Sequence, residues 1–282
     1  MRILLAGHKG QLGRALVPVL AVEHDVVGAD LPEHDITDRT AVLDLVRRVS
    51  PDLILNSAAM TNVDGCAENP QLAFTINGTG TQNLALAAQT GNAEMLQVST
   101  NEVFDGTASL PYDEWAPRQA INAYGQSKLA GERYVETLLN RFYIVRTAWL
   151  YAAGGRNFPH RIIELADQHG SLRVVDDEVG SPTYVVDLAD AIAQLIETHA
   201  YGFYHFVNDG AVSRYQFART ILAISGREAI PITAIKSSEW QRASTPPLYA
   251  PLHNYAGTAL GISLRAWDRA LADFLEQTGY HR

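Results

Sequence analysis

The feature that most constrains the fold is the regular alternation, through the first half of the chain, of short apolar runs with longer segments of helical periodicity. The apolar runs lie at 3–6, 25–29, 53–55, 95–98 and 142–145, and the helical patterns at 11–21, 40–49, 71–89 and 122–139. Short continuous apolar runs are typical of parallel strands buried on both faces. Their alternation with helices predicts an α/β fold, a Rossmann-type doubly wound parallel sheet with right-handed crossovers.

The alternation of apolar runs and helical segments becomes irregular after about residue 150, where glycine and proline become more frequent. We therefore expect a dinucleotide-binding domain over 1–150 and a smaller, mainly substrate-binding domain over 151–282, with the chain re-entering the first domain near 203–207. In the second part we expect a helix from Ser181-Pro182-Thr183 to residue 197, one capped by Ser213, and a final helix over 264–277.

Composition excludes several partners. The net charge of −9 disfavours nucleic acid and anionic membranes. The one cysteine, Cys66, cannot form an intramolecular disulfide, and no signal or membrane-spanning segment is visible, so we expect a cytoplasmic protein. The nine histidines are scattered without the clustering of a metal site, so we expect no metal.

The first apolar run leads into Gly7-His8-Lys9-Gly10-Gln11-Leu12-Gly13, and a helical pattern follows. Glycines permit a tight turn and a close approach of the backbone to a pyrophosphate, and the helix N-terminus offers unpaired N–H groups to that anion. The spacing is GxxGxxG rather than GxGxxG. The position directly after an N-terminal strand favours a dinucleotide loop over a plain strand-to-helix turn.

Asp30 follows the second run, where an acidic residue can bind the adenosine ribose hydroxyls. Its charge would repel a 2′-phosphate, and no arginine adjoins it. We therefore expect NADH or NADPH, with NADH weakly favoured. Asp35 and Ile36 would lie near the adenine if the loop folds back, although Asp35 is equally well read as an exposed turn residue.

Tyr124 and Lys128 are four residues apart at a helix start, and so share a face. We expect the ammonium to lower the pKa of the phenol, so that Tyr124 acts as a general acid or base. Thr100 ends the fourth run, where strand ends point at the ligand crevice, and its hydroxyl can bond Tyr124 or a substrate oxygen.

Nearly the whole chain resembles the extended short-chain dehydrogenases/reductases, and within them the dTDP-4-dehydrorhamnose reductase family. The resemblance rests on six stretches: Gly7 to Gly13, Asn56 to Asp64, Ser99-Thr100 with Val103 to Gly106, Tyr124 to Glu132, Arg146 to Trp149 with Gly155-Arg156-Asn157-Phe158, and Asp176 to Thr183. It implies reduction of the C4 ketone of a dTDP-linked 6-deoxyhexose by a nicotinamide cofactor.

The resemblance also implies roles for single residues. Gly10, Gln11 and Leu12 would hold the pyrophosphate, and Asp30, Asp35 and Ile36 the adenosine half. The cofactor would further contact Ala58, Ala59, Thr61, Tyr124 and Lys128. Catalysis would fall to Thr100, Tyr124 and Lys128, and sugar-nucleotide binding to Trp149, with Asn157 and Thr183 as pocket or turn residues.

This chain departs from the family pattern at positions that would recognise the substrate. Asn101-Glu102 replaces the usual Asp-Tyr, Pro246-Pro247 replaces Arg-Pro, and Ala250 replaces a serine. If the chain stays extended, Glu102 shares the side of Thr100 and faces the hexose; if it turns at Asn101, Glu102 faces solvent. Some relatives bridge a dimer with magnesium through a first-helix glutamate; here that position is Ala15, so a homodimer would lack that metal.

Two other functions fit parts of this pattern. Related sugar-nucleotide dehydratases and epimerases include enzymes that use Thr-Asp-Glu where this chain has Thr100-Asn101-Glu102, and an amide supplies no ionisable proton. A non-catalytic branch of the family serves as the regulatory subunit of methionine adenosyltransferase. The intact Thr100, Tyr124 and Lys128 argue against a purely binding role.

Overall fold

The computed structural model describes residues 1–154 and 157–280, so Gly155 and Arg156 of the glycine-rich match lie outside the described residues. Its centre is a six-stranded parallel sheet in the order β10-β5-β4-β3-β1-β2. The strands are β1 (Arg2–Ala6), β2 (Asp25–Ala29), β3 (Leu53–Asn56), β4 (Glu94–Thr100), β5 (Phe142–Thr147) and β10 (Gly202–His205). The doubly wound parallel sheet predicted from the apolar runs is confirmed.

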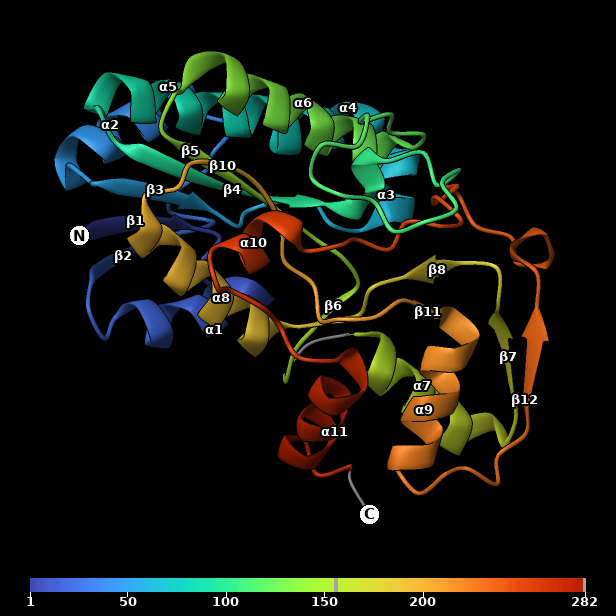
Figure 1. Cartoon of the computed structure of the whole chain (residues 1–282). Helices are drawn as coiled ribbons and strands as arrows, with labels where there is room; N and C mark the ends of the chain where they lie inside the picture. The colour runs from blue at the N-terminus through green and yellow to red at the C-terminus, as the bar shows by residue number, and fades with distance from the viewer. Residues whose placement is uncertain (155–156, 281–282) are drawn as a thin grey trace.

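Helices cover both faces of this sheet (Figure 1). One face carries α2 (Arg39–Val49), α5 (Thr81–Gly91) and α6 (Ala123–Leu138); the other carries α1 (Gln11–Leu20) and α8 (Val185–Thr198). Asp38 caps α2, since its side chain accepts the N–H of Ala41. Two clusters of buried apolar side chains form the core. The first lies between the sheet and helices α1 and α8 and continues among the C-terminal elements, and the second lies between the sheet and helices α2 and α5.

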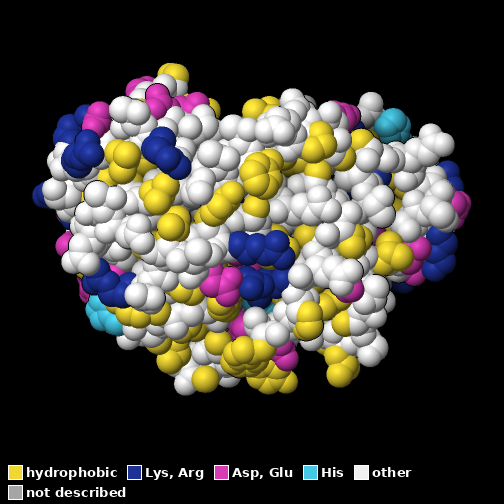
Figure 2. Space-filling view, turned by 90° about the horizontal axis from the view of Figure 1, so that it is seen from above, with side chains coloured by type: hydrophobic (Ala, Val, Ile, Leu, Met, Phe, Trp, Pro, Cys, Tyr) yellow, Lys and Arg dark blue, Asp and Glu magenta, His cyan; other side chains and the backbone are white. Residues whose placement is uncertain are grey.

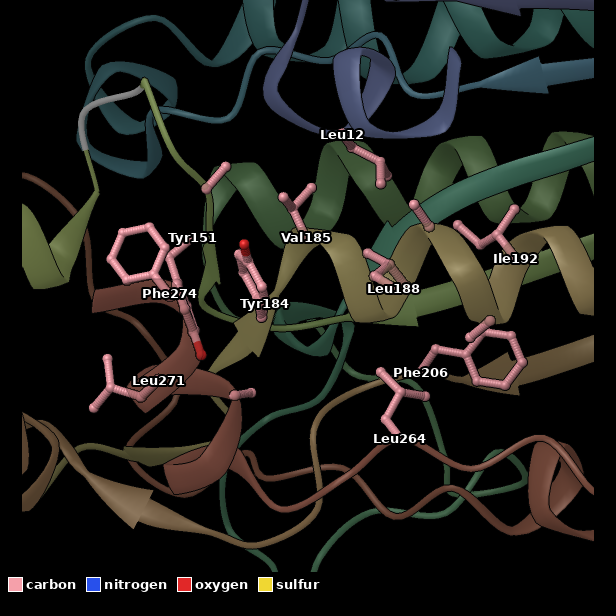
Figure 3. Packing of buried hydrophobic residues seen from close by; sticks show 14 of the residues in the cluster. Leu12, Tyr151, Tyr184, Val185, Leu188, Ile192, Phe206, Leu264, Leu271 and Phe274 are labelled. Atoms are coloured by element: carbon pink, nitrogen blue, oxygen red, sulfur yellow. The ribbon is translucent and has the colours of Figure 1, made fainter. Parts of the chain in front are cut away.

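The remaining elements pack beside the sheet and contribute most of the residues after 150 (Figure 1). The helices are α7 (Phe158–His169), α9 (Arg214–Ile224), α10 (Tyr255–Ala259) and α11 (Trp267–Gln277); the strands are β6 (Leu150–Tyr151), β7 (Leu172–Val175), β8 (Val179–Gly180), β9 (Thr183–Tyr184), β11 (Val212–Ser213) and β12 (Ile232–Ile235). Tyr151, Tyr184 and Phe274 meet where these elements join α8 (Figure 3), with ring centroids 5.0 to 5.8 Å apart. Ser213 caps α9 with a reciprocal capping box, as predicted.

Two predicted helices are corrected. The segment 71–89 is not one regular helix: α4 (Pro70–Ala73) leads into a π-helical turn, η1 (Phe74–Gly80), before α5. There α6 lies so close that a Cβ on Gly131 would be 2.7 Å from the Asn77 carbonyl oxygen. Thr183 is not helical, because it pairs with Leu150 as strand β9, and α8 begins only at Val185. A short helix, α3 (Val63–Glu68), was also not predicted.

The sheet order places the ligand crevice. The chain runs β2-β1-β3-β4-β5 across the sheet, so its direction of winding switches between β1 and β3. Ligands bind outside the carboxyl ends of the strands at such a switch point. Gly7 and Ala58 lie there, just after β1 and β3, and Thr100 is the last residue of β4.

Candidate active site

A cleft of about 470 Å³ opens at the carboxyl ends of β1, β3, β4 and β5. Twelve of the residues predicted from the sequence line it: Gly10, Gln11, Leu12, Gly13, Ala59, Thr61, Thr100, Asn101, Glu102, Tyr124, Lys128 and Trp149. A larger groove of about 900 Å³ lies at the opposite ends of the strands, near Ser50 and Asn92, and holds none of them. The chemistry of the lining residues therefore assigns the active site to the smaller cleft.

The glycine loop builds one wall of the cleft. Gly7 has φ +81°, and a Cβ there would lie 2.6 Å from the Ala58 nitrogen, so only glycine fits. A Cβ on Gly13 would overlap the Gly7 carbonyl oxygen. Gly10 is the N-cap of α1; it supplies no side-chain cap, and the first turn holds no acidic residue. The start of α1 thus brings no negative charge of its own to the place where a helix N-terminus favours an anion.

Asp30 lies next to this loop and outside the cleft lining. Its Oδ2 accepts the Lys9 N–H at 2.9 Å, and its Oδ1 accepts the Leu31 N–H at 2.8 Å. The Lys9 ammonium donates to the Leu31 carbonyl and pairs with Glu33 at 3.0 Å. Asp30 therefore holds the loop in place, and it brings with it a lysine that the sequence analysis had not considered.

Asp35, Ile36 and Ala58 also lie outside the lining of the cleft. Asp35 is exposed, and its Oδ1 accepts both the N–H and the hydroxyl of Thr37, which is the turn role left open above. Asp35 and Ile36 border a small, mainly apolar cavity between β1, β2 and α2. Ala58 is packed against Gly7.

Tyr124 stands on the first turn of α6, which Asn122 caps by accepting the Gly125 N–H at 2.8 Å. Burial raises the pKa of Tyr124, the charge of Glu102 raises it further, and a hydrogen bond with Thr100 opposes both. The expected lowering of this pKa by Lys128 is therefore wrong for the protein alone. A phenol with a raised pKa keeps its proton at neutral pH, which suits a general acid.

Lys128 lies one turn further along α6, and its Nζ donates to the Val98 carbonyl at 2.7 Å. Burial lowers its pKa to about 8, although the nearby Glu132 charge acts in the opposite direction. The ammonium therefore binds the end of β4, and its lowered pKa brings its proton equilibrium close to neutral pH.

Glu102 also lines the cleft, for a reason that the sequence did not reveal. The chain does not stay extended after Thr100 but turns in a 3-10 segment, Asn101–Val103, so the argument from strand periodicity is wrong. The turn nevertheless sends Glu102 inward, where its Oε2 accepts the Asn122 amide at 2.6 Å. Burial raises the pKa of this carboxyl, against the lowering effects of Asn122 and Arg214. Asn101 is buried, and its amide donates to the Ala250 carbonyl.

Trp149 closes the far side of the cleft and stacks under Arg214, whose guanidinium carbon is 3.5 Å from the ring centroid. Trp149 has φ +44°, an uncommon conformation for a non-glycine residue. Sequence reasoning missed Arg214. An arginine at the first position of a helix is typical of an exposed face, and only the packing of α9 beside Trp149 turns it inward.

Asn157 and Thr183 are not brought to the lining of the cleft. The Asn157 side chain caps α7 by accepting the His160 N–H at 3.0 Å, and its amide donates to the Ala152 carbonyl. Thr183 is fully buried and donates to the Ser181 carbonyl. Both residues have the structural role that the sequence analysis had kept as the alternative.

Over residues 1–154 and 157–280, no group of three or more His, Cys, Asp or Glu side chains is arranged to hold a metal ion. Within the same ranges, no helix is both long and apolar enough to cross a bilayer. Figure 2 shows basic side chains interspersed with acidic ones on the face seen from above.

The sequence and the structure of this chain are both similar to those of known proteins. The family described as RmlD substrate binding domain matches residues 1–279. A dTDP-4-dehydrorhamnose reductase of Streptomyces griseus is 38% identical over 96% of this chain and 92% of its own length. The crystal structure of a dTDP-4-dehydrorhamnose reductase from Clostridium acetobutylicum superposes with a TM-score of 0.95 at 38% identity, covering 99% of this chain and 100% of that one.

A dTDP-4-dehydrorhamnose reductase from Bacillus anthracis, solved in complex with NADP, superposes with a TM-score of 0.94 at 35% identity and covers 98% of this chain and 99% of that one. The likeness thus extends over the sheet, the cleft and the C-terminal elements together. The chain belongs to the RmlD substrate-binding family, the family of the dTDP-4-dehydrorhamnose reductases, within the extended short-chain dehydrogenases/reductases.

Proposed function

We propose that this protein uses NADH or NADPH to reduce the C4 ketone of a dTDP-4-dehydro-6-deoxy-L-hexose. The substrate we assign is dTDP-4-dehydrorhamnose and the product dTDP-L-rhamnose, a nucleotide sugar for cell-surface polysaccharide. The observation that carries the proposal is the position of Tyr124, bonded to Thr100, on the wall of the cleft into which the start of α1 opens.

The chemistry follows from these groups. When bound, the nicotinamide cofactor supplies the hydride that reaches C4. Tyr124 gives its proton to the ketone oxygen, so the carbonyl becomes a secondary alcohol and no net charge is left on the sugar. The Thr100 hydroxyl, bonded to Tyr124, holds the phenol toward that oxygen. Lys128 binds the nicotinamide ribose.

The residues present fit a dinucleotide. The glycine loop leaves no room for side chains at Gly7 and Gly13, and the first turn of α1 has no cap and no acid. These features suit a pyrophosphate held by Gly10, Gln11 and Leu12, with Ala58, Ala59 and Thr61 along the dinucleotide. Asp30, Asp35 and Ile36 would then lie at the adenosine end.

The choice between the two cofactors is a finer question. The Asp30 carboxylate favours the free ribose diol of NADH, since it repels a 2′-phosphate. Lys9, whose N–H binds Asp30, brings a cation close by, although Glu33 partly neutralises it. The Asp30 carboxylate and the Lys9 ammonium act on a 2′-phosphate in opposite directions, so the preference for NADH over NADPH should be small.

Location and assembly complete the proposal. We assign residues 1–150 mainly to the cofactor and 151–282 mainly to the sugar nucleotide, with the β10 segment returning to the sheet. We place the enzyme in the cytoplasm, in keeping with its free, buried Cys66. The homodimer remains a prediction, and size-exclusion chromatography with light scattering would test it.

The decisive experiment supplies dTDP-4-dehydro-6-deoxy-L-hexoses with each cofactor and follows both cofactor oxidation and the identity of the sugar product. A reductase consumes one NAD(P)H for each hydroxyl formed. A dehydratase or epimerase changes the sugar with no net consumption of cofactor, and a regulatory subunit changes neither. Asn101 disfavours the dehydratase, because its amide carries no ionisable proton and is committed to the Ala250 carbonyl.

A further inference from the structure

Two oppositely charged side chains of the cleft, Glu102 and Arg214, are not used by the reduction step. Both line the cleft together with Tyr124 and Trp149. Glu102 comes two residues after Thr100, whose hydroxyl accepts the Glu102 N–H at 3.2 Å. Since Thr100 bonds the phenol of Tyr124, this pair lies close to the point where the ketone must be reduced.

Each of the two side chains is held in place but keeps hydrogen-bonding capacity. Glu102 uses Oε2 to accept the Asn122 amide at 2.6 Å; no described residue donates a hydrogen bond to its Oε1. Arg214 is fixed by stacking on Trp149, and its nearest carboxylate oxygen, on Glu178, is 3.6 Å from Nε. A carboxylate accepts hydrogen bonds and a guanidinium donates them in a fixed plane, so the pair presents one acceptor and one donor group.

The charge around this pair decides what it can bind. Arg242 shares Glu178 with Arg214, with Nη1 3.8 Å from the Glu178 carboxylate, and its Nε is 3.0 Å from Asp64. Two guanidinium groups thus face three carboxyl groups, those of Glu102, Glu178 and Asp64. A diphosphate placed here would meet an environment without excess positive charge, whereas neutral hydroxyl groups would satisfy both the acceptor and the donor.

We propose that Glu102 and Arg214 together bind two neighbouring hydroxyl groups of the hexose ring, Glu102 as acceptor and Arg214 as donor, and so determine which hexose is reduced. The inference rests on the proposed reductase function, because it takes the ligand to be a hexose held with its ketone at Tyr124. It also gives a physical role to the departure Asn101-Glu102: the turn at Asn101 directs an acceptor to the sugar.

The first test removes single hydroxyl groups from the substrate. The parent dTDP-4-keto-6-deoxyhexose is compared with analogues that lack the C2 or the C3 hydroxyl. Hydrogen bonds to charged groups are strong enough that the protein should favour the parent over at least one analogue by roughly ten- to a hundredfold in kcat/KM. In Glu102→Ala this preference should shrink to within about threefold, because mainly the parent loses rate.

Matched variants distinguish a specific effect on recognition of the sugar from a general loss of activity caused by damage to the fold. Glu102→Gln keeps the size and one acceptor oxygen, so it should keep part of the preference. Arg214→Met should reduce the preference for the neighbouring hydroxyl. Glu164→Ala, which removes an exposed carboxylate that pairs with Arg161 at 3.4 Å, should leave every ratio unchanged. An equal loss for all substrates in Glu102→Ala, Glu102→Gln and Arg214→Met would overturn the proposal.

Binding measured without turnover distinguishes the remaining outcomes. By calorimetry, Arg214→Met should bind dTDP as tightly as the unaltered protein; a loss of tenfold or more would show that Arg214 holds the diphosphate and would refute the hydroxyl assignment. If the unaltered protein reduces no dTDP-4-ketohexose, the proposed function itself fails. The role of Glu102 and Arg214 is then tested by measuring the affinity for dTDP-rhamnose and for its deoxy analogues. Equal affinities would refute the proposed binding of the hydroxyl groups independently of the reductase function.

Discussion

Arg146 and Glu132 form a two-pronged ion pair inside the protein, with Nε 2.9 Å from Oε1 and Nη2 2.9 Å from Oε2. Both side chains are at most 1% exposed. Glu132 also accepts the Ser99 hydroxyl at 2.6 Å and pairs with Arg118 at 3.2 Å. The pair therefore ties α6, which carries Tyr124, to the ends of β4 and β5 directly beneath the cleft. Although burial raises the pKa of Glu132, Arg146 and Arg118 lower it more.

The first prediction is that Arg146→Met destabilises the fold by about 3–5 kcal/mol, because it leaves a buried carboxylate without its main partner. Denaturant unfolding with and without the substitution measures the difference. Arg161→Met, which breaks the exposed pair with Glu164, should cost less than about 1 kcal/mol. Similar losses in the two variants would show that burial does not set the strength of these pairs.

The second prediction concerns the proton donor. Tyr124→Phe removes the hydroxyl proposed to protonate the ketone, so kcat should fall by roughly 10²- to 10⁴-fold while cofactor affinity stays the same. Steady-state rates and a cofactor titration measure the two effects. Tyr134→Phe on the same helix lines no part of the cleft and should react at the normal rate. Turnover by Tyr124→Phe within a few fold of normal would remove Tyr124 from the mechanism.

The third prediction concerns cofactor choice. Asp30→Asn keeps an oxygen for the Lys9 N–H but removes the charge, so NADH should bind roughly three- to tenfold more weakly while NADPH loses less or gains. Dissociation constants for both cofactors measure the ratio. Asp44→Asn, whose carboxylate is exposed and pairs with Arg47, is the control and should change neither affinity. Equal losses for NADH and NADPH would show that Asp30 acts only on the loop.

The fourth prediction is a pH dependence that arises from Lys128. Its pKa is lowered to about 8, so the ammonium loses its proton as the pH rises through about 8, and kcat/KM for the cofactor should decline there. Tyr124 does not contribute to this decline, because its pKa is raised. In Lys128→Arg the charge persists, so the rate should be lower but flat over the same range. A profile of the unaltered enzyme that stays flat well above pH 8 would contradict the assignment.

Local sequence determined the parts of this protein that depend on neighbouring residues. The apolar runs predicted all the strands that the first half contributes to the central sheet. Parallel strands covered by helices on both faces consist mainly of apolar residues, so they stand out as continuous apolar runs in the sequence. Gly7, Gly10 and Gly13 marked the loop, since backbone geometry admits no Cβ at Gly7 or Gly13. The i to i+4 spacing placed Tyr124 and Lys128 on one face of α6, and both line the cleft.

Tertiary structure alone decided the rest, because those features depend on residues far apart in the chain. Arg214 reaches the cleft only because α9 packs beside Trp149, and Glu102 turns inward at a 3-10 segment that strand periodicity does not predict. The pKa of Tyr124 rises although a lysine lies one turn away, since burial outweighs that neighbour and Lys128 donates to Val98 instead. Spacing shows which side chains can share a face; the desolvation and charge that set their chemistry come from every element packed around them.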